Sequence, residues 1–238
     1  MKVLIIIPAY NEEKNILNTV NMVKSYKKIK LDYVVINDGS KDNTEEILNK
    51  NNINHVTLVN NSGIGAAVQT GYIYAAKNNY DIAIQFDGDG QHDINYVDRL
   101  IDAIEKEGYN MAIGSRFVGN ESEFKSSSTR RLGIKILSFI LKLITGKRIK
   151  DMTSGYRAVD KNIIQLFSKN YDFEYPEPIT NLVIIKKKYK VKEVPVKMYE
   201  RKFGKSSINL YKSLYYMVSV SLTLFILGIG GSSKWVLS

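Results

Sequence analysis

The sequence predicts an α/β fold, in which a mostly parallel sheet carries helices on both faces. Short apolar runs alternate with segments of helical periodicity over the first ~115 residues, and this alternation is typical of a parallel sheet with crossover helices. The runs carry Val and Ile at successive positions, as strands buried on both faces do. With 238 residues, of which 44% are hydrophobic, the chain can form one large core.

Five apolar runs are expected to be the strands, because each is short and bounded by polar or glycine residues. They cover residues 3–7, 33–36, 56–59, 82–86 and 111–114. Helices are expected between them, at residues 16–23, around 47–48, at 63–77 and at 97–104. Asn11 and Asp42 are the expected N-caps of the first two helices.

The alternation ends after Arg116, and residues 117–207 are expected to fold onto the sheet as the second half of one domain. The elements expected there are a loop at 118–128, a basic amphipathic helix at 130–144, a polar turn at 151–157, a short helix at 163–167, a buried element at 179–185 and a strand at 191–198. That strand contains Pro195, which cannot donate to a ladder, so the strand is predicted to lie at an edge.

Composition excludes several kinds of site. The chain has no cysteine and only two histidines, His55 and His92, so disulfides, thiolate sites and histidine-rich metal sites are excluded. Its net charge of +10 favours an anionic partner such as a membrane or a phosphorylated substrate. No nucleic-acid-binding module accompanies this charge, so nucleic acid is not an expected partner. No secretory signal is visible, so a cytoplasmic location is expected.

Residues 208–238 are expected to form a hydrophobic helix that associates with a membrane. The stretch from Leu214 to Gly231 carries no charged side chain and is just shorter than the ~20 residues that a bilayer-spanning helix needs. Three interpretations stay open: a helix lying on the membrane, a single span, and a helix packed in a protein interface. In the first, the basic segment 130–142 would help to dock the chain on an anionic membrane surface.

Clustered carboxylates follow the fourth predicted strand, in the sequence Asp87-Gly88-Asp89-Gly90-Gln91-His92. Open α/β sheets bind ligands at the carboxyl ends of their strands, and two aspartates one residue apart can share a hard divalent cation. A calcium-binding loop fits poorly, because its sixth position requires glycine and here holds His92, and because the stretch follows a strand. A polar turn that caps a helix is the other structural interpretation.

A dinucleotide-binding motif is incomplete in this chain. Gly63-Ile64-Gly65 follows the third predicted strand and opens a helix, but Val68 replaces the third glycine of the fingerprint. The small residues still predict that the start of this helix, at Gly65, can approach a phosphate or sugar closely.

Four polar segments follow four successive strands and should meet at one edge of the sheet. They are Pro8-Ala9-Tyr10-Asn11-Glu12, Asp38-Gly39-Ser40, Asn61-Ser62-Gly63-Ile64-Gly65 and Asp87-Gly88-Asp89. In this combination the chain resembles a family 2 inverting glycosyltransferase, close to the polyprenyl-phosphate (dolichol-phosphate) sugar transferases, from Val3 to about Ser207. The resemblance implies a GT-A fold, a Rossmann-like nucleotide-binding sheet, with residues 1–116 as the nucleotide-sugar half and 117–207 as the acceptor half.

The resemblance also implies roles on the donor side. Pro8, Tyr10 and Glu12 would frame the nucleoside, and Asp38 would contact its base or ribose. Asp87 and Asp89, joined by Gly88, would hold Mg²⁺ or Mn²⁺ on the diphosphate together with Gln91. Arg116 resembles the arginine that approaches the donor, and Arg201 the arginine of a late phosphate-binding loop. Positive charges there would stabilise the leaving diphosphate.

The acceptor side offers candidates for a base and for acceptor binding. A hydroxyl acceptor needs a carboxylate to take its proton; Glu177 is the preferred candidate, with Glu174 and Asp151 as alternatives. The string Tyr175-Pro176-Glu177-Pro178 resembles the acceptor-side segment of polysaccharide-assembly members of the family. A lipid phosphate is already ionised and needs no strong base. The residues expected to bind the acceptor are Arg130, Arg131, Ser154, Arg201 and Lys205. Ser207 departs from the lysine that dolichol-phosphate enzymes often carry there.

The sequence therefore predicts a metal-dependent inverting glycosyltransferase. It would move a sugar from a UDP-, GDP- or dTDP-sugar to a membrane-linked acceptor, such as a polyprenyl phosphate or a growing cell-surface glycan, at the inner membrane face of a bacterial or archaeal cell. The alternatives are a metal-dependent nucleotidyltransferase and a non-catalytic nucleotide-sugar-binding protein. The oligomeric state is not predicted.

Overall fold

The computed structural model describes residues 1–119, 128–199 and 210–229, without the side chains of 128–130, 210–215 and 229. The strands are β1 Val3–Ala9, β2 Leu31–Asn37, β3 His55–Thr57, β4 Ile82–Gln85, β5 Met111–Ser115, β6 Arg157–Asp160 and β7 Val191–Pro195. The helices are α1 Ile16–Ser25, α2 Thr44–Lys50, α3 Ile64–Lys77, α4 Val97–Glu105, α5 Ser128–Thr145, α6 Lys161–Lys169, α7 Pro176–Lys186 and α8 Leu210–Ile229. A short 3₁₀ helix, Ile94–Tyr96, precedes α4.

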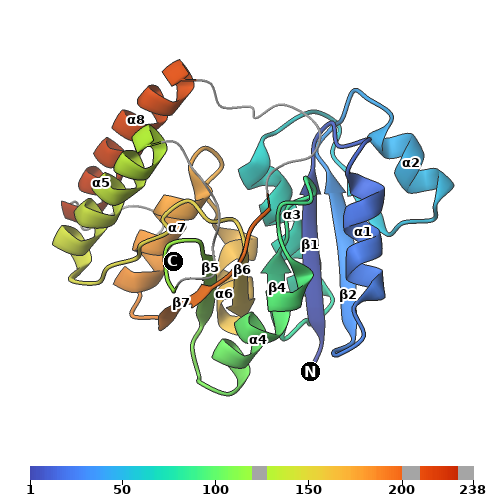
Figure 1. Ribbon diagram of the computed structural model, residues 1–238, viewed down its shortest axis with the longest axis horizontal. Helices are drawn as coiled ribbons and strands as arrows, with labels where there is room; N and C mark the ends of the chain where they lie inside the picture. Colours follow the sequence, from blue (N-terminus) through green and yellow to red (C-terminus); the bar gives the residue numbers. More distant parts are fainter. Residues whose placement is uncertain (120–127, 200–209, 230–238) are drawn as a thin grey trace.

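Seven described strands form one sheet in the order β3-β2-β1-β4-β6-β5-β7 (Figure 1). Neighbouring strands pair in parallel, except that β6 runs antiparallel to both β4 and β5. The five predicted strands and the edge position of β7, which contains Pro195, are confirmed. The order reverses between β1 and β4, and such a switch point opens a crevice at the carboxyl ends of the strands.

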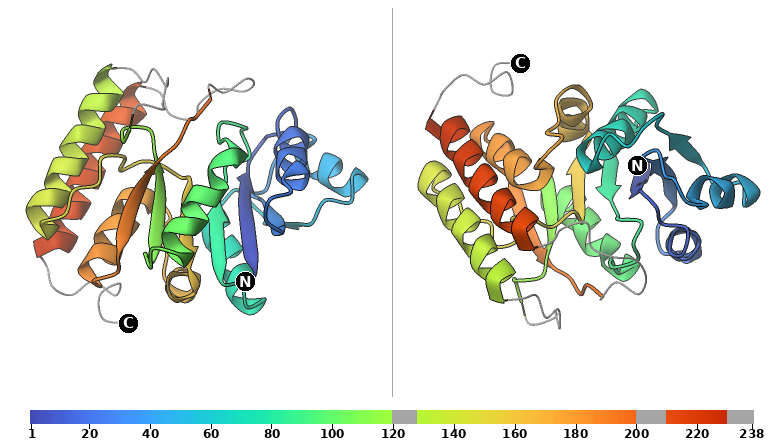
Figure 2. Two further views of the ribbon diagram at one scale, coloured as in Figure 1. Left: turned by 60° about the horizontal axis from the view of Figure 1, so that its bottom comes forward. Right: turned by 90° about the horizontal axis from the view of Figure 1, so that it is seen from above.

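Helices cover both faces of the sheet, as predicted (Figure 2). Alternate residues of β1 explain why both faces are apolar. Leu4 and Ile6 pack in the cluster that includes α3, α6 and α7, whereas Ile5 and Ile7 pack in the cluster that includes α1 and α4. All four side chains are fully buried. A strand with two apolar faces belongs in the interior of an α/β sheet. β1 is such an interior strand, between β2 and β4.

Helices α5 and α8 lie side by side beyond β7, at the end of the molecule opposite α2 (Figures 1 and 2). Glycines permit their close approach, because a Cβ on Gly133 would lie 2.7 Å from Met217 Sδ and one on Gly228 would lie 2.7 Å from Ile144. Lys186 of α7 donates hydrogen bonds to the carbonyls of Leu227 and Gly228, at 2.9 and 3.0 Å. These bonds satisfy carbonyls that the end of α8 leaves without an intrahelical donor.

No helix within the described residues is long and apolar enough to cross a membrane. The hydrophobic C-terminal helix that the sequence predicts corresponds to α8, which begins at Leu210 and ends at Ile229.

Both expected helix caps are wrong, and one strand was not expected. Asp42 is not the N-cap of α2, which begins at Thr44 with Asn43 at its N-cap position. Asn11 does not cap α1, which begins at Ile16 with Asn15 at its N-cap position. Asn11 has a positive φ of 54°, so the chain turns there and needs a longer path before the helix begins. The sequence also gave no indication of β6. Its four residues follow a polar turn and pair antiparallel with strands more than forty residues away in sequence, which local periodicity does not report.

Candidate active site

The acidic turn after β4 is fixed to the end of β1. The Gly88 amide donates to the carbonyl of Pro8 at 3.2 Å, and Thr19 of α1 donates to the carbonyl of Gly88 at 3.0 Å. A Cβ on Gly88 would lie 2.9 Å from that Pro8 oxygen, so only glycine permits this approach. The two neighbouring strand ends thereby hold Asp87 and Asp89 at the switch point of the sheet.

Three buried aromatic rings, those of Phe86, His92 and Tyr156, pack against one another beside the acidic turn. His92 stacks on Tyr156, with ring centroids 4.6 Å apart, and Phe86 meets both rings edge-on. His92 Nδ1 accepts a hydrogen bond from the Asp87 amide at 3.1 Å. Burial lowers the pKa of His92 to about 4, so the imidazole is neutral near pH 7. His92, which a calcium loop could not accommodate, is therefore a buried support for the Asp87 backbone.

The other end of the turn is tied to the chain that follows β7. The Gln91 amide donates to Asp89 Oδ1 at 3.1 Å. Gln91 also exchanges hydrogen bonds with the backbone of Tyr199: its carbonyl accepts from the Tyr199 amide at 2.8 Å, and its Nε2 donates to the Tyr199 carbonyl at 3.2 Å. The Tyr199 hydroxyl donates to Asp93 Oδ2 at 3.0 Å. Tyr199 lies two residues before Arg201, which falls outside the described residues together with Lys205.

A polar pocket lies beyond the carboxyl ends of β2 and β3, on the edge of the sheet that also carries the acidic turn. It has a volume of about 460 Å³. The residues that line it are Gly39, Ser40, Lys41, Glu45, Thr57, Leu58, Val59, Asn60 and Asn61. Gly39 has a φ of +59°, and a Cβ there would lie 2.6 Å from the Asn60 backbone. The pocket therefore depends on glycine at position 39.

Asp38 directly precedes the lining residue Gly39, and its carboxylate holds the loop before α3. Its two oxygens accept hydrogen bonds from the amides of Ser62 and Gly63, at 2.8 and 2.9 Å, and Asp38 is only 3% exposed. The side chain predicted to contact a base or ribose therefore also fixes the loop between β3 and α3. Charge-assisted bonds of this kind are stronger than neutral ones, so the loop is held firmly.

The segment after β1 is held in the same way. The Asn11 amide donates to Ser40 Oγ at 2.9 Å, and Asn11 Oδ1 accepts from the Lys41 amide at 2.8 Å. Glu12, predicted to frame a nucleoside, is 7% exposed and accepts from Asn15 Nδ2 at 2.6 Å. Tyr10 is 37% exposed and Pro8 is buried within β1. Of these candidates Tyr10 presents the most surface to a ligand.

The turn that precedes β6 closes over Asp87. A Cβ on Gly155 would lie 3.0 and 3.2 Å from the two Asp87 carboxylate oxygens and 2.7 Å from Gln85 Nε2. The absence of a side chain at position 155 therefore leaves room beside the carboxylate. Ser154, predicted to bind the acceptor, instead donates its hydroxyl to the Gly114 carbonyl at 2.6 Å and is buried. It anchors the turn to β5.

Substituting Gly155 by alanine should weaken the binding of a divalent metal about tenfold, because the methyl group would displace Gln85 from the hydrogen bond that it donates to Asp87 Oδ1 at 3.1 Å. Calorimetric titration of Mn²⁺ with nucleoside diphosphate present measures this. Gly108→Ala is the control: Gly108 has a φ of +70° with no atom within 4 Å of its Cβ position, so it should lower stability but leave metal affinity unchanged. Equal metal affinity in the Gly155 variant would contradict the contact.

Arg116 and Asp151 form a buried ion pair behind this turn. Arg116 donates through Nε and Nη2 to the two Asp151 oxygens, at 2.8 and 2.6 Å, and its amide donates to Asp151 Oδ2 at 3.0 Å. The side chains are 6% and 0% exposed. Arg116 Nη2 also donates to Thr153 Oγ1 at 3.0 Å. Both oxygens of this buried carboxylate already accept hydrogen bonds from Arg116, which suits a residue that holds the arginine in place. The geometry therefore disfavours Asp151 as the base.

Glu177 lies close to the acidic turn, at the start of α7. Burial raises its pKa, and Asp87 raises it further, whereas the positive charge of Arg157 and a hydrogen bond from Gln85 oppose the shift. Glu174, the alternative candidate, is exposed and lies just before α7. Of the predicted bases, the structure brings Glu177 into the electrostatic environment of Asp87.

Sequence reasoning missed the buried polar pair beneath Asp87. Gln85 is 1% exposed and Arg157 is fully buried. Arg157 donates to the Ser154 carbonyl at 2.7 Å and to Thr180 Oγ1 at 2.8 Å. Gln85 Oε1 and Arg157 Nη2 have no hydrogen-bond partner within the described part of the chain. The sequence signal that could have indicated this pair is Gln85, a polar residue inside the apolar run 82–86. A buried polar group needs a hydrogen-bond partner, so a polar neighbour could have been expected.

The remaining predicted residues are placed as follows. Gly65 does make a close approach, but to the chain's own backbone: a Cβ there would lie 2.3 Å from the Asp172 carbonyl oxygen. Arg131 lies on an exposed face of α5. Arg130 belongs to the same helix, but its side chain is outside the described part.

The residues at the acidic turn fit a divalent cation shared with a substrate. No group of three or more His, Cys, Asp or Glu side chains within the described ranges could hold a metal alone. Mg²⁺ in phosphate-transfer sites is commonly bound by one or two carboxylates together with substrate phosphates, and not by a cage of protein ligands. Asp87, whose side chain is 34% exposed, and Asp89 can supply such carboxylates.

Comparisons with known proteins identify relatives over most of the chain. The model of Glycosyl transferase family 2 matches residues 4–167. A UDP-N-acetylglucosamine–dolichyl-phosphate N-acetylglucosaminyltransferase of Methanococcus voltae is 35% identical over 215 residues, or 82% of this chain and 84% of that protein. A polyprenol monophosphomannose synthase of Mycolicibacterium smegmatis is 28% identical, over 87% of this chain and 81% of that protein.

Solved structures show the same fold. Glucosyl-3-phosphoglycerate synthase from Mycobacterium tuberculosis, in complex with Mn²⁺, UDP and glucosyl-3-phosphoglycerate, superposes with a TM-score of 0.69. The match covers 98% of this chain and 81% of that protein at 16% sequence identity. An identity this low carries the fold alone.

Proposed function

The protein belongs to glycosyl transferase family 2 and has a GT-A fold, and we propose that it transfers a sugar from a nucleotide-sugar donor to a polyprenyl phosphate, with inversion at the sugar carbon. The observation that carries this proposal is the position of the acidic turn. Asp87 and Asp89 lie at the β1/β4 switch point, on the sheet edge that also carries the polar pocket of about 460 Å³. Relatives that match over four fifths of this chain are named as transferases to dolichyl phosphate and as polyprenol phosphomannose synthases.

The donor would lie along the edge of the sheet. We place the nucleoside in the pocket beyond β2 and β3, with Tyr10 and Asp38 beside it, and the diphosphate toward the acidic turn. Asp87, Asp89 and Gln91 would hold Mg²⁺ or Mn²⁺. When bound, this metal would neutralise the charge that develops on the departing nucleoside diphosphate. Residues 1–116 thus form the donor half and 117–207 the acceptor half.

The transfer step needs few protein groups if the acceptor is a phosphate. An oxygen of the polyprenyl phosphate attacks the anomeric carbon, and the bond from that carbon to the diphosphate breaks, with the electron pair leaving on the diphosphate oxygen. Phosphate monoesters lose their second proton near pH ~6, so no strong base is required. Glu177 would serve as the base if the acceptor were a sugar hydroxyl, because a raised pKa suits proton transfer near neutral pH.

Arg116 would stabilise negative charge while Asp151 fixes its orientation. A guanidinium held by two bonds to a carboxylate keeps a defined direction. We assign Arg201 a similar role, together with Arg130 and Lys205 on the acceptor side.

The helical pair α5 and α8 would dock on a membrane that holds the acceptor. Eight large apolar side chains on it are between 45% and 69% exposed. They are Leu132, Ile136, Phe139 and Leu143 on α5, and Val218, Leu222, Phe225 and Ile226 on α8. Contiguous apolar surface of this kind marks an interaction site, and basic residues of α5 such as Lys142 suit an anionic cytoplasmic surface. The protein would then be peripheral on the inner face of the membrane.

One experiment tests the proposal as a whole. The purified chain is mixed with UDP-, GDP- and dTDP-sugars and Mn²⁺, with and without vesicles that contain polyprenyl phosphate. We expect nucleoside diphosphate release that depends on the polyprenyl phosphate, and recovery of the protein with anionic vesicles after sedimentation. Release of pyrophosphate would indicate a nucleotidyltransferase instead. Transfer to a glycan hydroxyl alone would contradict the acceptor, and protein that stays in the supernatant would contradict the docking surface.

A further inference from the structure

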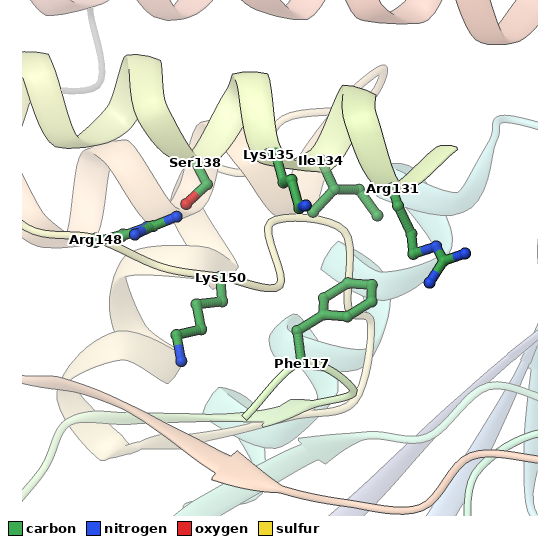
Figure 3. A pocket seen from close by; sticks show the side chains of 7 residues that line it. All are labelled: Phe117, Arg131, Ile134, Lys135, Ser138, Arg148 and Lys150. Atoms are coloured by element: carbon green, nitrogen blue, oxygen red, sulfur yellow. The ribbon is translucent and has the colours of Figure 1, made fainter. Parts of the chain in front are cut away.

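A second pocket lies beside α5, away from the polar pocket at β2 and β3. It has a volume of about 160 Å³, and four of the seven residues that line it are basic. The lining residues that matter here are Phe117, Arg131, Lys135, Ser138, Arg148 and Lys150. Figure 3 shows side chains of α5 on one wall, with the Phe117 ring facing them and Arg148 beside Ser138, while the side chain of Lys150 extends away from α5.

The α5 wall follows from helical spacing. Arg131, Lys135 and Ser138 are four and three residues apart, so they share one face of the helix. The exposed apolar stripe that begins at Leu132 lies on the neighbouring face. The pocket is therefore adjacent to the surface that we propose contacts the membrane.

The charges of this pocket have one sign. Four of its lining residues are cations, Arg131, Lys135, Arg148 and Lys150, and no carboxylate lines it. Within the described residues, none of the four forms an ion pair. Cations gathered around a concavity repel one another, and an anion bound there would relieve that repulsion.

Ser138 supplies an independent observation. It is 1% exposed and lines the pocket, yet its Oγ has no hydrogen-bond partner among the described residues. A buried hydroxyl without a partner is costly. An oxygen-rich anion in the pocket would accept the hydrogen bond that Ser138 can donate.

The opposite wall connects this pocket to the Arg116–Asp151 pair. Glu193 accepts hydrogen bonds from the amides of Lys150 and Asp151, at 2.8 and 2.9 Å. The Arg116 guanidinium lies 5.5 Å from the centre of the Phe117 ring. The lining residues Phe117 and Lys150 are therefore direct chain neighbours of the ion pair behind the acidic turn.

We propose that this pocket binds the phosphate group of a membrane lipid, with Lys135, Arg148 and Lys150 as its cations and Ser138 as a hydrogen-bond donor. The inference rests on the proposed function for its choice of a lipid ligand. Two lipids carry this chemistry, the polyprenyl phosphate acceptor and an anionic phospholipid. The experiment below separates them.

Binding to vesicles tests the site without requiring turnover. Ser138→Ala, Arg148→Ala and Lys150→Ala are compared with Lys147→Ala and Lys169→Ala, which each remove one positive charge from exposed positions outside the pocket. The vesicles contain phosphatidylcholine alone, with polyprenyl phosphate, or with phosphatidylglycerol at equal charge. Mn²⁺-dependent binding of nucleoside diphosphate is measured for each variant, so failure of the donor site is seen separately.

We expect each pocket variant to bind the two kinds of anionic vesicle about tenfold more weakly, as loss of one charge-assisted hydrogen bond predicts, while the controls change less than twofold. Loss on polyprenyl phosphate vesicles alone identifies the acceptor as the ligand, and equal loss on phosphatidylglycerol identifies a phospholipid. Unchanged binding by the pocket variants, or an equal loss in the controls, would overturn the site. A purely structural Ser138 would alter only the melting temperature.

Discussion

Asp89→Asn is expected to lower the rate of sugar transfer about 10³-fold, the largest effect on activity that we predict. The substitution removes one negative charge from the acidic turn but almost no volume. The new side chain keeps an oxygen that can accept the 3.1 Å hydrogen bond from the Gln91 amide, so the turn should persist. The measurement is nucleoside diphosphate release at saturating donor, with Mn²⁺ affinity determined in parallel.

Asp93→Asn is the matched control for that experiment. Asp93 lies four residues further along, and its carboxylate is used internally: Oδ1 accepts from the Asn95 amide at 3.0 Å and Oδ2 from the Tyr199 hydroxyl at 3.0 Å. The control should transfer sugar at nearly the rate of the unmodified chain. Full metal-dependent activity in the Asp89→Asn variant would contradict the assignment of Asp89 as a metal ligand.

The sequence allowed the meeting of the β1 and β4 ends to be predicted because its signals are local. A continuous apolar run such as residues 3–7 predicts a doubly buried strand, and parallel strands bring their carboxyl ends to one edge. The carboxyl ends of β1 and β4 were therefore expected to lie together, and the hydrogen bond from the Gly88 amide to the Pro8 carbonyl shows that they do. This prediction required only that the strands be parallel, and the alternation of strands and helices along the chain indicates that they are.

The acceptor side could not be predicted to the same depth because its contacts are distant in sequence. The strand β6 inserts antiparallel between β4 and β5, and it carries Arg157 into the layer beneath Asp87. Gly155 reaches the Asp87 carboxylate only through that insertion. Periodicity reports which face of an element is buried, but it does not report which distant element covers it. Ser154 was therefore predicted to bind the acceptor and Asp151 was kept as a candidate base, whereas both side chains form hydrogen bonds within the protein.

Asp151→Asn is expected to lower the free energy of unfolding by about 3–5 kcal/mol, the largest effect on stability that we predict. Arg116 would remain buried with its charge uncompensated, and the new amide nitrogen would face the guanidinium, which can only donate. Removing one partner of a buried pair costs much more than the pair itself contributes. Urea denaturation monitored by circular dichroism measures the loss.

An exposed ion pair provides the control. Glu107→Ala breaks the pair between Glu107 and Lys192, which are 44% and 36% exposed, and should lower the free energy of unfolding by less than ~1 kcal/mol.

A second comparison separates positioning from proton transfer. If Asp151 only holds Arg116, the double variant Asp151→Leu with Arg116→Met should recover most of the stability without recovering transfer, because it removes both buried charges together with the arginine that we assign to the donor. A base at Asp151 would instead leave Asp151→Asn stable and inactive. The two outcomes differ in stability as well as in rate, so one unfolding curve distinguishes them.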